Sequence, residues 1–493
     1  MKNWLKTLSI SRLTILFIGI VSVVLIFSAI LKEKGNYKVI ASDGVGYYSY
    51  LPNTFLSNTL DSQIPDSRFF VEVNRKGVNK YYVGTAVSMS PFFTIGHLLA
   101  LAKGEETDGF TVSYQLAISL AGFVYLLGGL FFLGRLLRQF HFSETVISCV
   151  LLLIFFGTNL IEYSLWQPSM SHVYSFFWIS GFLYFCKKFF NERKNKQLYL
   201  AGFFLALVVL VRPLNGIIVF ALPFLLGSKR DLQQFLIAVF KKKRVFPSLI
   251  IVISVLFIQS LFWQLQSGDW LIWSYTNEGF EFANPHILEF LFSFRKGAFI
   301  YTPILILAIF GIVARFKKNK FQSLSGLLFI FGLFYLLSSW WNWYYGPSFG
   351  QRPLVEFYPI FGVFIALLLE KIKQNWMKIF VAIFALFCVI LNLIQTYQYN
   401  NNIISHWDMN AEKYAYTFLK TSKNYKDILG GNNDIMVYNA KLDTVFSEFF
   451  DFEPLDDLNN SENFRLQKME IGFRDYTHRE FNFETKIPTN KSF

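Results

Sequence analysis

One carboxylate stands among glycines and aromatic rings in residues 42–52, which read SDGVGYYSYLP. Asp43 can act as a general base toward a hydroxyl or an amine, and the glycines after it leave room for a ligand to approach the backbone. The same pattern also fits an Asx-turn at the start of a helix, with Tyr47 and Tyr48 as anchors at a membrane interface. By itself the segment favours this structural interpretation, so a catalytic role depends on what surrounds Asp43.

Four basic residues stand at the edges of apolar runs, where they could hold an anionic group. Lys80 precedes the apolar residues 83–102, Arg212 separates two apolar runs, Arg295 lies in FRKG and Arg352 follows a glycine-containing loop. A guanidinium can bind a phosphate through two parallel hydrogen bonds, whereas a lysine ammonium acts as a point charge. The alternative is that these side chains reach lipid headgroups without a specific ligand.

Aromatic rings cluster in residues 340–353, which read WWNWYYGPSFGQRP. Their faces can stack on a sugar ring, although an aromatic belt at the membrane interface explains the same composition. Trp343 and Tyr345 from this cluster, with Tyr47 and Tyr48 from the first segment, are the candidates for binding a sugar or an acceptor.

Motifs of several other chemistries are absent from the sequence. It has no GxxxxGK[ST] loop and no HExxH motif, and its three cysteines lie inside apolar runs. We therefore expect neither a metal site nor a cofactor. Ion-coupled transporters usually need a charge at mid-membrane depth, and Arg212 is the one residue that could supply it. The ionisable groups favour chemistry at a membrane surface over passage through the membrane.

The elements that must position these residues are long apolar segments. Charged residues make up 16% of the 493 residues, against about a quarter in soluble domains. Residues 13–31 hold no charge, and at about 1.5 Å of rise per residue they match a hydrocarbon core of about 30 Å. This run is too long for a signal peptide, which predicts a retained helix. About eleven membrane segments are expected, at residues 12–31, 111–134, 144–161, 170–187, 197–211, 213–227, 245–266, 298–314, 321–339, 354–370 and 378–398.

The net charge of +13 is concentrated in one set of loops. These loops hold 23 Lys and Arg against 4 Asp and Glu, and they comprise the N-terminal segment and residues 135–144, 187–196, 229–244, 315–320 and 370–378. Such an asymmetry follows the positive-inside rule and places the N-terminus and these loops in the cytoplasm. The basic charge is thus a topology signal, and we expect no nucleic-acid partner.

The remaining loops are predicted to be extracytoplasmic. The longest, residues 32–110, contains Asp43 and is the expected catalytic loop. Its apolar part, residues 83–102, can lie in the membrane interface rather than cross. The break at Arg212-Pro213 predicts a hairpin with Arg212 near the outer face; one kinked helix is the alternative. Residues 1–398 are expected to form the membrane domain, and residues 399–493 a small extracytoplasmic C-terminal domain.

The order and sidedness of these segments resemble the GT-C superfamily of membrane glycosyltransferases, specifically the bacterial relatives of dolichyl-phosphate-mannose protein mannosyltransferases and of the aminoarabinose transferase. The resemblance covers roughly residues 10–370. It rests on the helix layout and on five motifs in order: SDGVGYYSYLP, NKYYVGTAVSMSPFF, VLVRPLNG, FSFRKGAFIYTP and SFGQRPLVEFYP. It implies an all-α polytopic protein of the bacterial inner membrane.

The resemblance also implies a reaction. The donor would be a sugar on a polyprenyl phosphate, and the acceptor an extracytoplasmic glycolipid, cell-envelope glycan or protein. Asp43 would be the base that deprotonates the acceptor, and direct attack by the acceptor would invert the anomeric configuration. The donor phosphate would be held by Lys80, Arg212 and Arg352, with Arg295 behind them.

Gly44 stands where many relatives carry a second acidic residue, which argues against a metal site of DxD type. A second carboxylate could come instead from Glu105, Glu106 or Asp108, although nothing in the sequence places them near Asp43. Partial burial beside an aromatic ring is expected to raise the pKa of Asp43. Two alternative functions remain: a transporter or flippase of lipid-linked glycan, and a glycan ligase or polymerase on the same scaffold.

Overall fold

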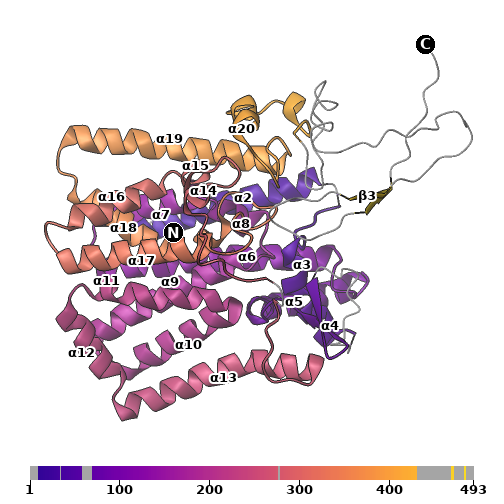
Figure 1. The fold of residues 1–493 in the computed structure, drawn as a ribbon, viewed down its shortest axis with the longest axis horizontal. Helices are drawn as coiled ribbons and strands as arrows, with labels where there is room; N and C mark the ends of the chain where they lie inside the picture. The colour runs from indigo at the N-terminus through magenta and orange to yellow at the C-terminus, as the bar shows by residue number, and fades with distance from the viewer. Residues whose placement is uncertain are drawn as a thin grey trace, which may run out of the picture.

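A computed structural model describes residues 9–33, 35–57, 69–275, 278–429, 468–470 and 482–484. Most of its long helices run along the longest axis of the molecule (Figure 1). Seven helical segments of the described residues are long and apolar enough to cross a membrane: α2 (Ile10–Lys32), α5 (Gly84–Lys103), α6 (Val112–Gln139), α13 (Lys242–Ser267), α17 (Lys320–Ser338), η3 with α18 (Arg352–Phe357 and Tyr358–Lys371) and α19 (Asn375–Asn400).

Further helices and two strand pairs complete the described structure. The bundle also contains α7 (Glu144–Phe156), α9 (His172–Glu192), α10 (Asn195–Val211), η2 (Pro213–Ala221), α11 (Leu222–Leu226) and α16 (Leu305–Arg315). The remaining elements are α3 (Asp43–Tyr48), α4 (Tyr50–Phe55), β1 (Phe70–Val73), β2 (Lys76–Asn79), α8 (Leu160–Leu165), α12 (Lys229–Val239), α14 (Ile287–Phe292), α15 (Ala298–Tyr301), α20 (Ala411–Thr417), η4 (Lys423–Tyr425), β3 (Lys468–Glu470) and β4 (Asn482–Glu484). Strands β1 and β2 form an antiparallel hairpin in which Phe70 lies opposite Asn79.

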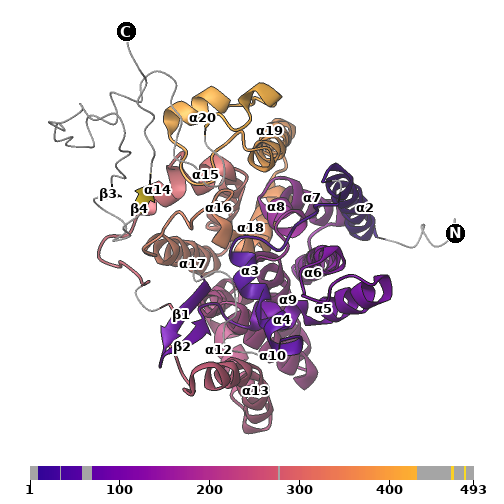
Figure 2. The ribbon, with the colours of Figure 1, turned by 90° about the vertical axis from the view of Figure 1, so that its right-hand side faces the viewer.

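The position of each helix follows from where its apolar side chains lie. Every residue from Tyr358 to Leu368 in α18 is buried, as expected for a helix that is apolar on all sides. Helices α2, α13 and α19 instead expose large apolar side chains and lie at the rim, around α9 and α18 (Figure 2). The prediction of a mostly helical, multi-pass membrane protein is confirmed, whereas the number of eleven crossings stays a prediction.

Two of the predicted segments are interrupted at prolines. Residues 298–314 were expected as one helix, but α15 ends at Tyr301 and α16 begins at Leu305, after Pro303. Residues 213–227 form the 3-10 helix η2 and the short α11, which contain Pro213 and Pro223. Proline lacks a backbone N–H and clashes with the preceding turn, so it interrupts these segments.

The hairpin predicted around Arg212 is confirmed. Arg212 has extended backbone angles between α10 and η2, as the following proline favours. After this break the chain returns to Gly227, which lines the same cavity as Asn191, just before the start of α10. Both arms therefore end at the same end of the bundle, which excludes a single kinked helix.

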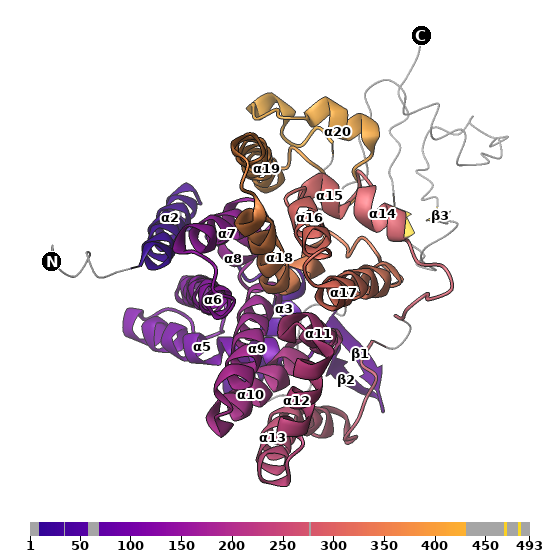
Figure 3. The same cartoon turned by 90° about the vertical axis from the view of Figure 1, so that its left-hand side faces the viewer.

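Helix α5 lies crosswise to the bundle. It runs across the view in Figures 2 and 3, in which α6 is seen along its axis. The two helices pack against each other, so α5 lies against the side of the bundle near one end. This arrangement fits an interfacial position for residues 83–102, although α5 has the length and composition to cross.

The predicted basic loops meet at one end of the bundle, which we call the basic end. Residues at the ends of α6, α9, α11, α16 and α17 line one cavity there. Elements α3, α4, β1, β2 and α20 lie at the opposite end (Figures 1 and 2). Most of the predicted C-terminal domain, residues 430–493 apart from β3 and β4, lies outside the described residues.

Candidate active site

Two glycines allow Asp43 to sit among packed side chains at the start of α3. An added Cβ at Gly44 would lie 2.0 Å from Ser169 Oγ, and one at Gly46 would lie 2.4 Å from the Tyr81 ring. Gly46 thus admits Tyr81, whose side chain hydrogen-bonds to the Asp43 carboxylate. No side chain fits at position 44 without movement of Ser169, so a second acidic residue has no room there.

Asp43 is paired with Arg352, the first residue of η3. Arg352 Nη2 donates to Asp43 Oδ2 at 2.7 Å. The Arg352 side chain is 9% exposed and that of Asp43 27%. The Nε and Nη1 atoms of Arg352 are buried and have no hydrogen-bond partner among the described residues. A buried guanidinium with unused donors can accept a further anion.

The pKa of Asp43 lies below its ordinary value. Burial raises this pKa, but the positive charge of Arg352 and hydrogen bonds from Tyr81 and Arg352 together lower it further than burial raises it, with a smaller contribution from Lys80. The expectation of a raised pKa is therefore wrong. The sequence could not indicate the lowered pKa, because Arg352 lies 309 residues after Asp43 and only the fold brings the two into contact.

A second buried carboxylate, Glu356, lies four residues after Arg352 in η3. Its Oε1 accepts a hydrogen bond from Arg212 Nη1 at 2.8 Å and lies 3.1 Å from His172 Nδ1. Glu356 and His172 are each 1% exposed, and Arg212 interacts electrostatically with Arg352. Because a buried charge needs a partner, Glu356 fixes the Arg212 side chain beside the Asp43–Arg352 pair.

Lys80 borders the same group of residues from the β1–β2 side. Its Nζ lies 3.0 Å from Glu278 Oε1 and 5.5 Å from the centre of the Tyr81 ring. Tyr81 therefore contacts both Asp43 and Lys80. We call the following residues the Asp43 cluster: Asp43, Lys80, Tyr81, Arg212, Arg352 and Glu356.

The four candidate aromatic residues are placed differently. The Tyr47 ring packs against the Tyr81 ring, with 4.4 Å between ring centres, and so lies beside the Asp43 cluster. Tyr345 is buried, donates its hydroxyl to a backbone carbonyl and interacts electrostatically with Arg352. Trp343 stacks with the ring of His286, which directly precedes α14. Tyr48 is turned away from the cluster and donates to the Gly109 carbonyl at 2.5 Å.

Arg295 is not part of the cluster, and its neighbour Lys296 lies closer to it. The Arg295 guanidinium stacks on the Tyr344 ring at 3.4 Å. Lys296 is 2% exposed, and its Nζ donates to the carbonyls of Ser348 and His406. Burial, with the positive charges of Arg295 and Arg352, lowers the pKa of Lys296. Lys296 therefore connects the loop that carries Arg352 to the segment after α19.

The three acidic residues considered as a second carboxylate lie at the turn between α5 and α6. Glu105 accepts hydrogen bonds from the backbone N and side-chain Oγ of Ser113, and Asp108 accepts from the backbone of Phe110. Both carboxylates organise the start of α6. Glu356 supplies the second carboxylate near Asp43 instead.

Sequence reasoning missed Glu356, His172, Tyr81 and Lys296. Glu356 had a usable signal, because it is an acid inside the apolar run of residues 353–369, and a buried acid requires a partner. Tyr81 belongs to the NKYYVG motif, but which of its two tyrosines faces inward depends on the β1–β2 hairpin. His172 and Lys296 had no signal that separates them from ordinary packing and snorkelling residues.

A protein-family model described as a 6-pyruvoyl-tetrahydropterin synthase related domain, a membrane protein, matches residues 91–403. No curated protein matches the chain.

The chain is also similar to solved structures, at low sequence identity. For the apo oligosaccharyltransferase of Archaeoglobus fulgidus the identity is 14% and the TM-score 0.49, over 87% of this chain and 61% of that one. For AglB of the same organism, in complex with an inhibitory peptide and a dolichol-phosphate, the identity is 13% and the TM-score 0.49, again over 87% of this chain and 61% of that one. For ArnT from Cupriavidus metallidurans bound to undecaprenyl phosphate the identity is 11% and the TM-score 0.42, over 76% of this chain and 70% of that one. This chain thus spans about three fifths of the length of the first two.

Proposed function

We propose that this chain, which belongs to the family of 6-pyruvoyl-tetrahydropterin synthase related membrane proteins, is a glycosyltransferase. It would move a sugar from a polyprenyl-phosphate donor to an extracytoplasmic acceptor, with inversion at the anomeric carbon. The acceptor would be a glycolipid, a cell-envelope glycan or a protein. The sequence resemblance to GT-C enzymes and the Asp43 cluster support the proposal.

The single observation that carries it is the state of Arg352. This side chain is 9% exposed, holds Asp43 with Nη2 and has two further nitrogen atoms without a partner among the described residues. Buried donors without partners are rare, because each loses its hydration without compensation. A phosphate oxygen from a donor would satisfy them, in a place where a carboxylate is already at hand.

Donor binding would also prepare the base. A phosphate beside Arg352 would offset the positive charge that now holds the pKa of Asp43 low. Lys80 and Arg212 would add positive charge around the same phosphate, although each is already paired, with Glu278 and Glu356 respectively. We assign Arg295 no direct role, because its guanidinium lies on Tyr344.

The reaction would then be a direct displacement. The acceptor hydroxyl or amine gives its proton to Asp43, its heteroatom bonds to the anomeric carbon, and the bond between that carbon and the phosphate oxygen breaks. Positive charge develops on the sugar and negative charge on the leaving polyprenyl phosphate. Cations placed where this negative charge develops would stabilise the transition state.

Mass spectrometry of the lipids that co-purify with the full chain tests the proposal. Asp43→Asn removes the base but keeps the size of the side chain, so this variant should retain a sugar-bearing polyprenyl phosphate that wild type turns over. Arg352→Gln should retain less of it. Glu412→Gln, at an exposed position in the first turn of α20, is the matched control and should behave as wild type.

Ordinary phospholipids alone, in wild type and in Asp43→Asn, would remove the donor site and with it the proposal. A flippase would give a different result: Arg212→Gln would abolish function, whereas Asp43→Ala would be tolerated.

A further inference from the structure

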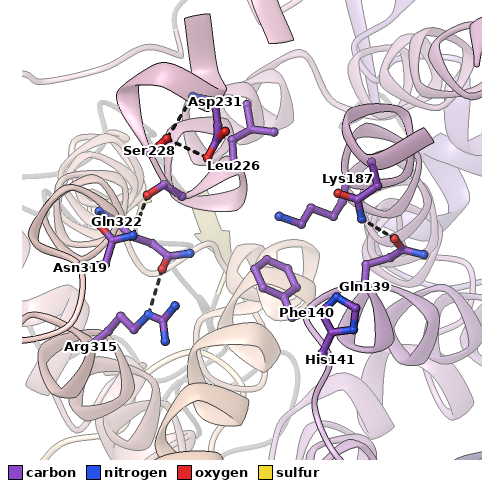
Figure 4. A pocket seen from close by; sticks show the side chains of 12 residues that line it. Gln139, Phe140, His141, Lys187, Leu226, Ser228, Asp231, Arg315, Asn319 and Gln322 are labelled. Carbon is purple, nitrogen blue, oxygen red and sulfur yellow. Dashed lines mark hydrogen bonds between the residues drawn. The ribbon is translucent and has the colours of Figure 1, made fainter. Parts of the chain in front are cut away.

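A second group of cations lies at the basic end, far from the Asp43 cluster. Lys187 stands 15 residues after His172 on α9, which is about 22 Å along a helix. It lines an open cavity of ≈ 610 Å³ together with residues from α6, α11, α12, α16 and α17. Figure 4 shows Lys187 and Arg315 on opposite sides of this space.

Lys187 has unused hydrogen-bonding capacity. Its Nζ donates to the Leu225 carbonyl at 2.9 Å and lies 4.7 Å from the centre of the Phe140 ring. An ammonium has three donors, and Lys187 forms no ion pair with a carboxylate of the described residues. Its charge is therefore available to a ligand in the cavity.

Arg315 is held in place by one nitrogen and keeps two free. Its Nε donates to Gln322 Oε1 at 3.0 Å, and Gln322 Nε2 in turn donates to the Phe224 carbonyl at 3.0 Å. Neither terminal nitrogen of Arg315 has a hydrogen bond within the described part of the chain. The guanidinium is thus oriented in advance, which lowers the cost of binding an anion.

Among the described residues, one acidic side chain lines the cavity, and it is engaged in its own helix. Asp231 Oδ2 accepts from Ser228 Oγ at 2.7 Å, and Ser228 Oγ caps α12 by accepting from the backbone N of Asp231. The Asp231 carboxylate lies in the first turn of α12, where it is stabilised by the helix dipole. The remaining polar lining includes the amides of Gln139, Asn191 and Asn319.

The neighbouring α12 indicates where this cavity lies relative to the membrane. It crosses the ends of α10 and α13 (Figure 1), buries Phe235 and Ala238, and exposes Leu236 and Ile237. A helix with an apolar exposed face and basic residues at its ends lies at a membrane interface. The cavity beside it is then at the level of lipid headgroups.

We propose that this cavity binds a phosphate group, and that Lys187 and Arg315 hold it from opposite sides. The group belongs either to an anionic phospholipid of the adjoining leaflet or to a soluble phosphate compound. Basic pockets between membrane helices on the cytoplasmic side are suited to anionic headgroups. This inference does not depend on the proposed glycosyltransferase activity.

The test titrates the full chain in detergent with phosphatidylglycerol, with zwitterionic phosphatidylcholine and with inorganic phosphate, and counts bound molecules by native mass spectrometry. Lys187→Gln/Arg315→Gln removes both cations. Lys317→Gln/Lys318→Gln makes the same charge change at exposed positions of the adjoining loop that do not line the cavity. Thermal unfolding of both variants without lipid shows whether they fold.

Loss of two charge-assisted contacts should weaken phosphatidylglycerol binding by about tenfold or more, whereas the control pair should change it by less than about threefold. That result, with weaker phosphatidylcholine binding, assigns the site to a lipid headgroup. The same variant dependence with inorganic phosphate alone assigns it to a soluble phosphate compound. Equal binding of every probe by folded Lys187→Gln/Arg315→Gln and by the control would overturn the inference.

Discussion

In the Asp43 cluster each of the two arginines is paired with a carboxylate, at 2.7 Å for Arg352 and 2.8 Å for Arg212. In the cavity at the basic end Lys187 and Arg315 donate hydrogen bonds to a carbonyl and an amide oxygen, and neither is paired with a carboxylate of the described residues. Burial explains the pairing of Arg352, whose side chain is 9% exposed, because a cation that is removed from water needs an opposite charge. Lys187 and Arg315 are only partly buried and keep part of their hydration. The first arrangement suits a reaction with charge development, and the second suits reversible binding of an anion.

The largest difference in activity is expected between substitutions of one acidic residue at each end, Asp43 and Asp231. Asp43→Asn should lower kcat by about 10²–10⁴-fold, because a general base is lost. Asp231→Asn should leave kcat within about twofold, because asparagine still fits the first turn of α12. Transfer of a labelled sugar from a polyprenyl-phosphate donor in proteoliposomes measures both. A similar loss in the two variants would show that the ends do not differ in this way.

A second prediction concerns pH. Arg352 helps to hold the pKa of Asp43 below its ordinary value, so the carboxylate stays ionised, and kcat/KM stays constant, down to pH values below about 4. In Arg352→Gln this lowering influence is lost while burial still raises the pKa. The acid limb of the residual activity should therefore move to higher pH, along with a fall in kcat/KM of about 10²-fold.

Arg315→Gln is the matched control for this profile, since it removes one guanidinium from the other end. Its acid limb should coincide with that of wild type. An unchanged limb in Arg352→Gln would mean that Asp43 is not the titrating group.

A third, smaller effect is expected for glycines at the two ends, measured as thermal unfolding in detergent. Gly44→Ala places a methyl group against Ser169 Oγ, which should destabilise the fold by about 1–3 kcal/mol and displace Asp43. Gly227→Ala has space around it but a φ of +93°, which should cost about 1–2 kcal/mol without loss of transfer. Ser169→Gly should restore much of the stability of Gly44→Ala and leave Gly227→Ala unchanged.

The two ends were also predictable to different degrees. The basic end followed from counting charges in loops, since the positive-inside rule depends on composition rather than on contacts. The Asp43 cluster did not. The resemblance assigned Asp43, Lys80, Arg212 and Arg352 to one reaction, but their pairing depends on where α3, β2, the α10–η2 break and η3 meet. Local periodicity contains no information on such long-range contacts, and Glu356 and Tyr81 were overlooked for the same reason.

The smallest effect is expected at Arg295, which the sequence suggested as a phosphate-binding residue and which lies outside the Asp43 cluster in the structure. Its guanidinium stacks on Tyr344 and donates to the Trp407 carbonyl, contacts worth about 1 kcal/mol or less at a partly exposed site. Arg295→Gln should therefore change kcat/KM by less than about fivefold. Lys296→Met should do more, because it leaves the buried Ser348 carbonyl without its donor, at about 1–3 kcal/mol, and removes one of the two donors to the His406 carbonyl. Since Ser348 lies in the loop that carries Arg352, weakened donor binding should accompany this loss of stability. The opposite order, with Arg295→Gln the more harmful, would return the phosphate-binding role to Arg295 and show that Lys296 only fills space.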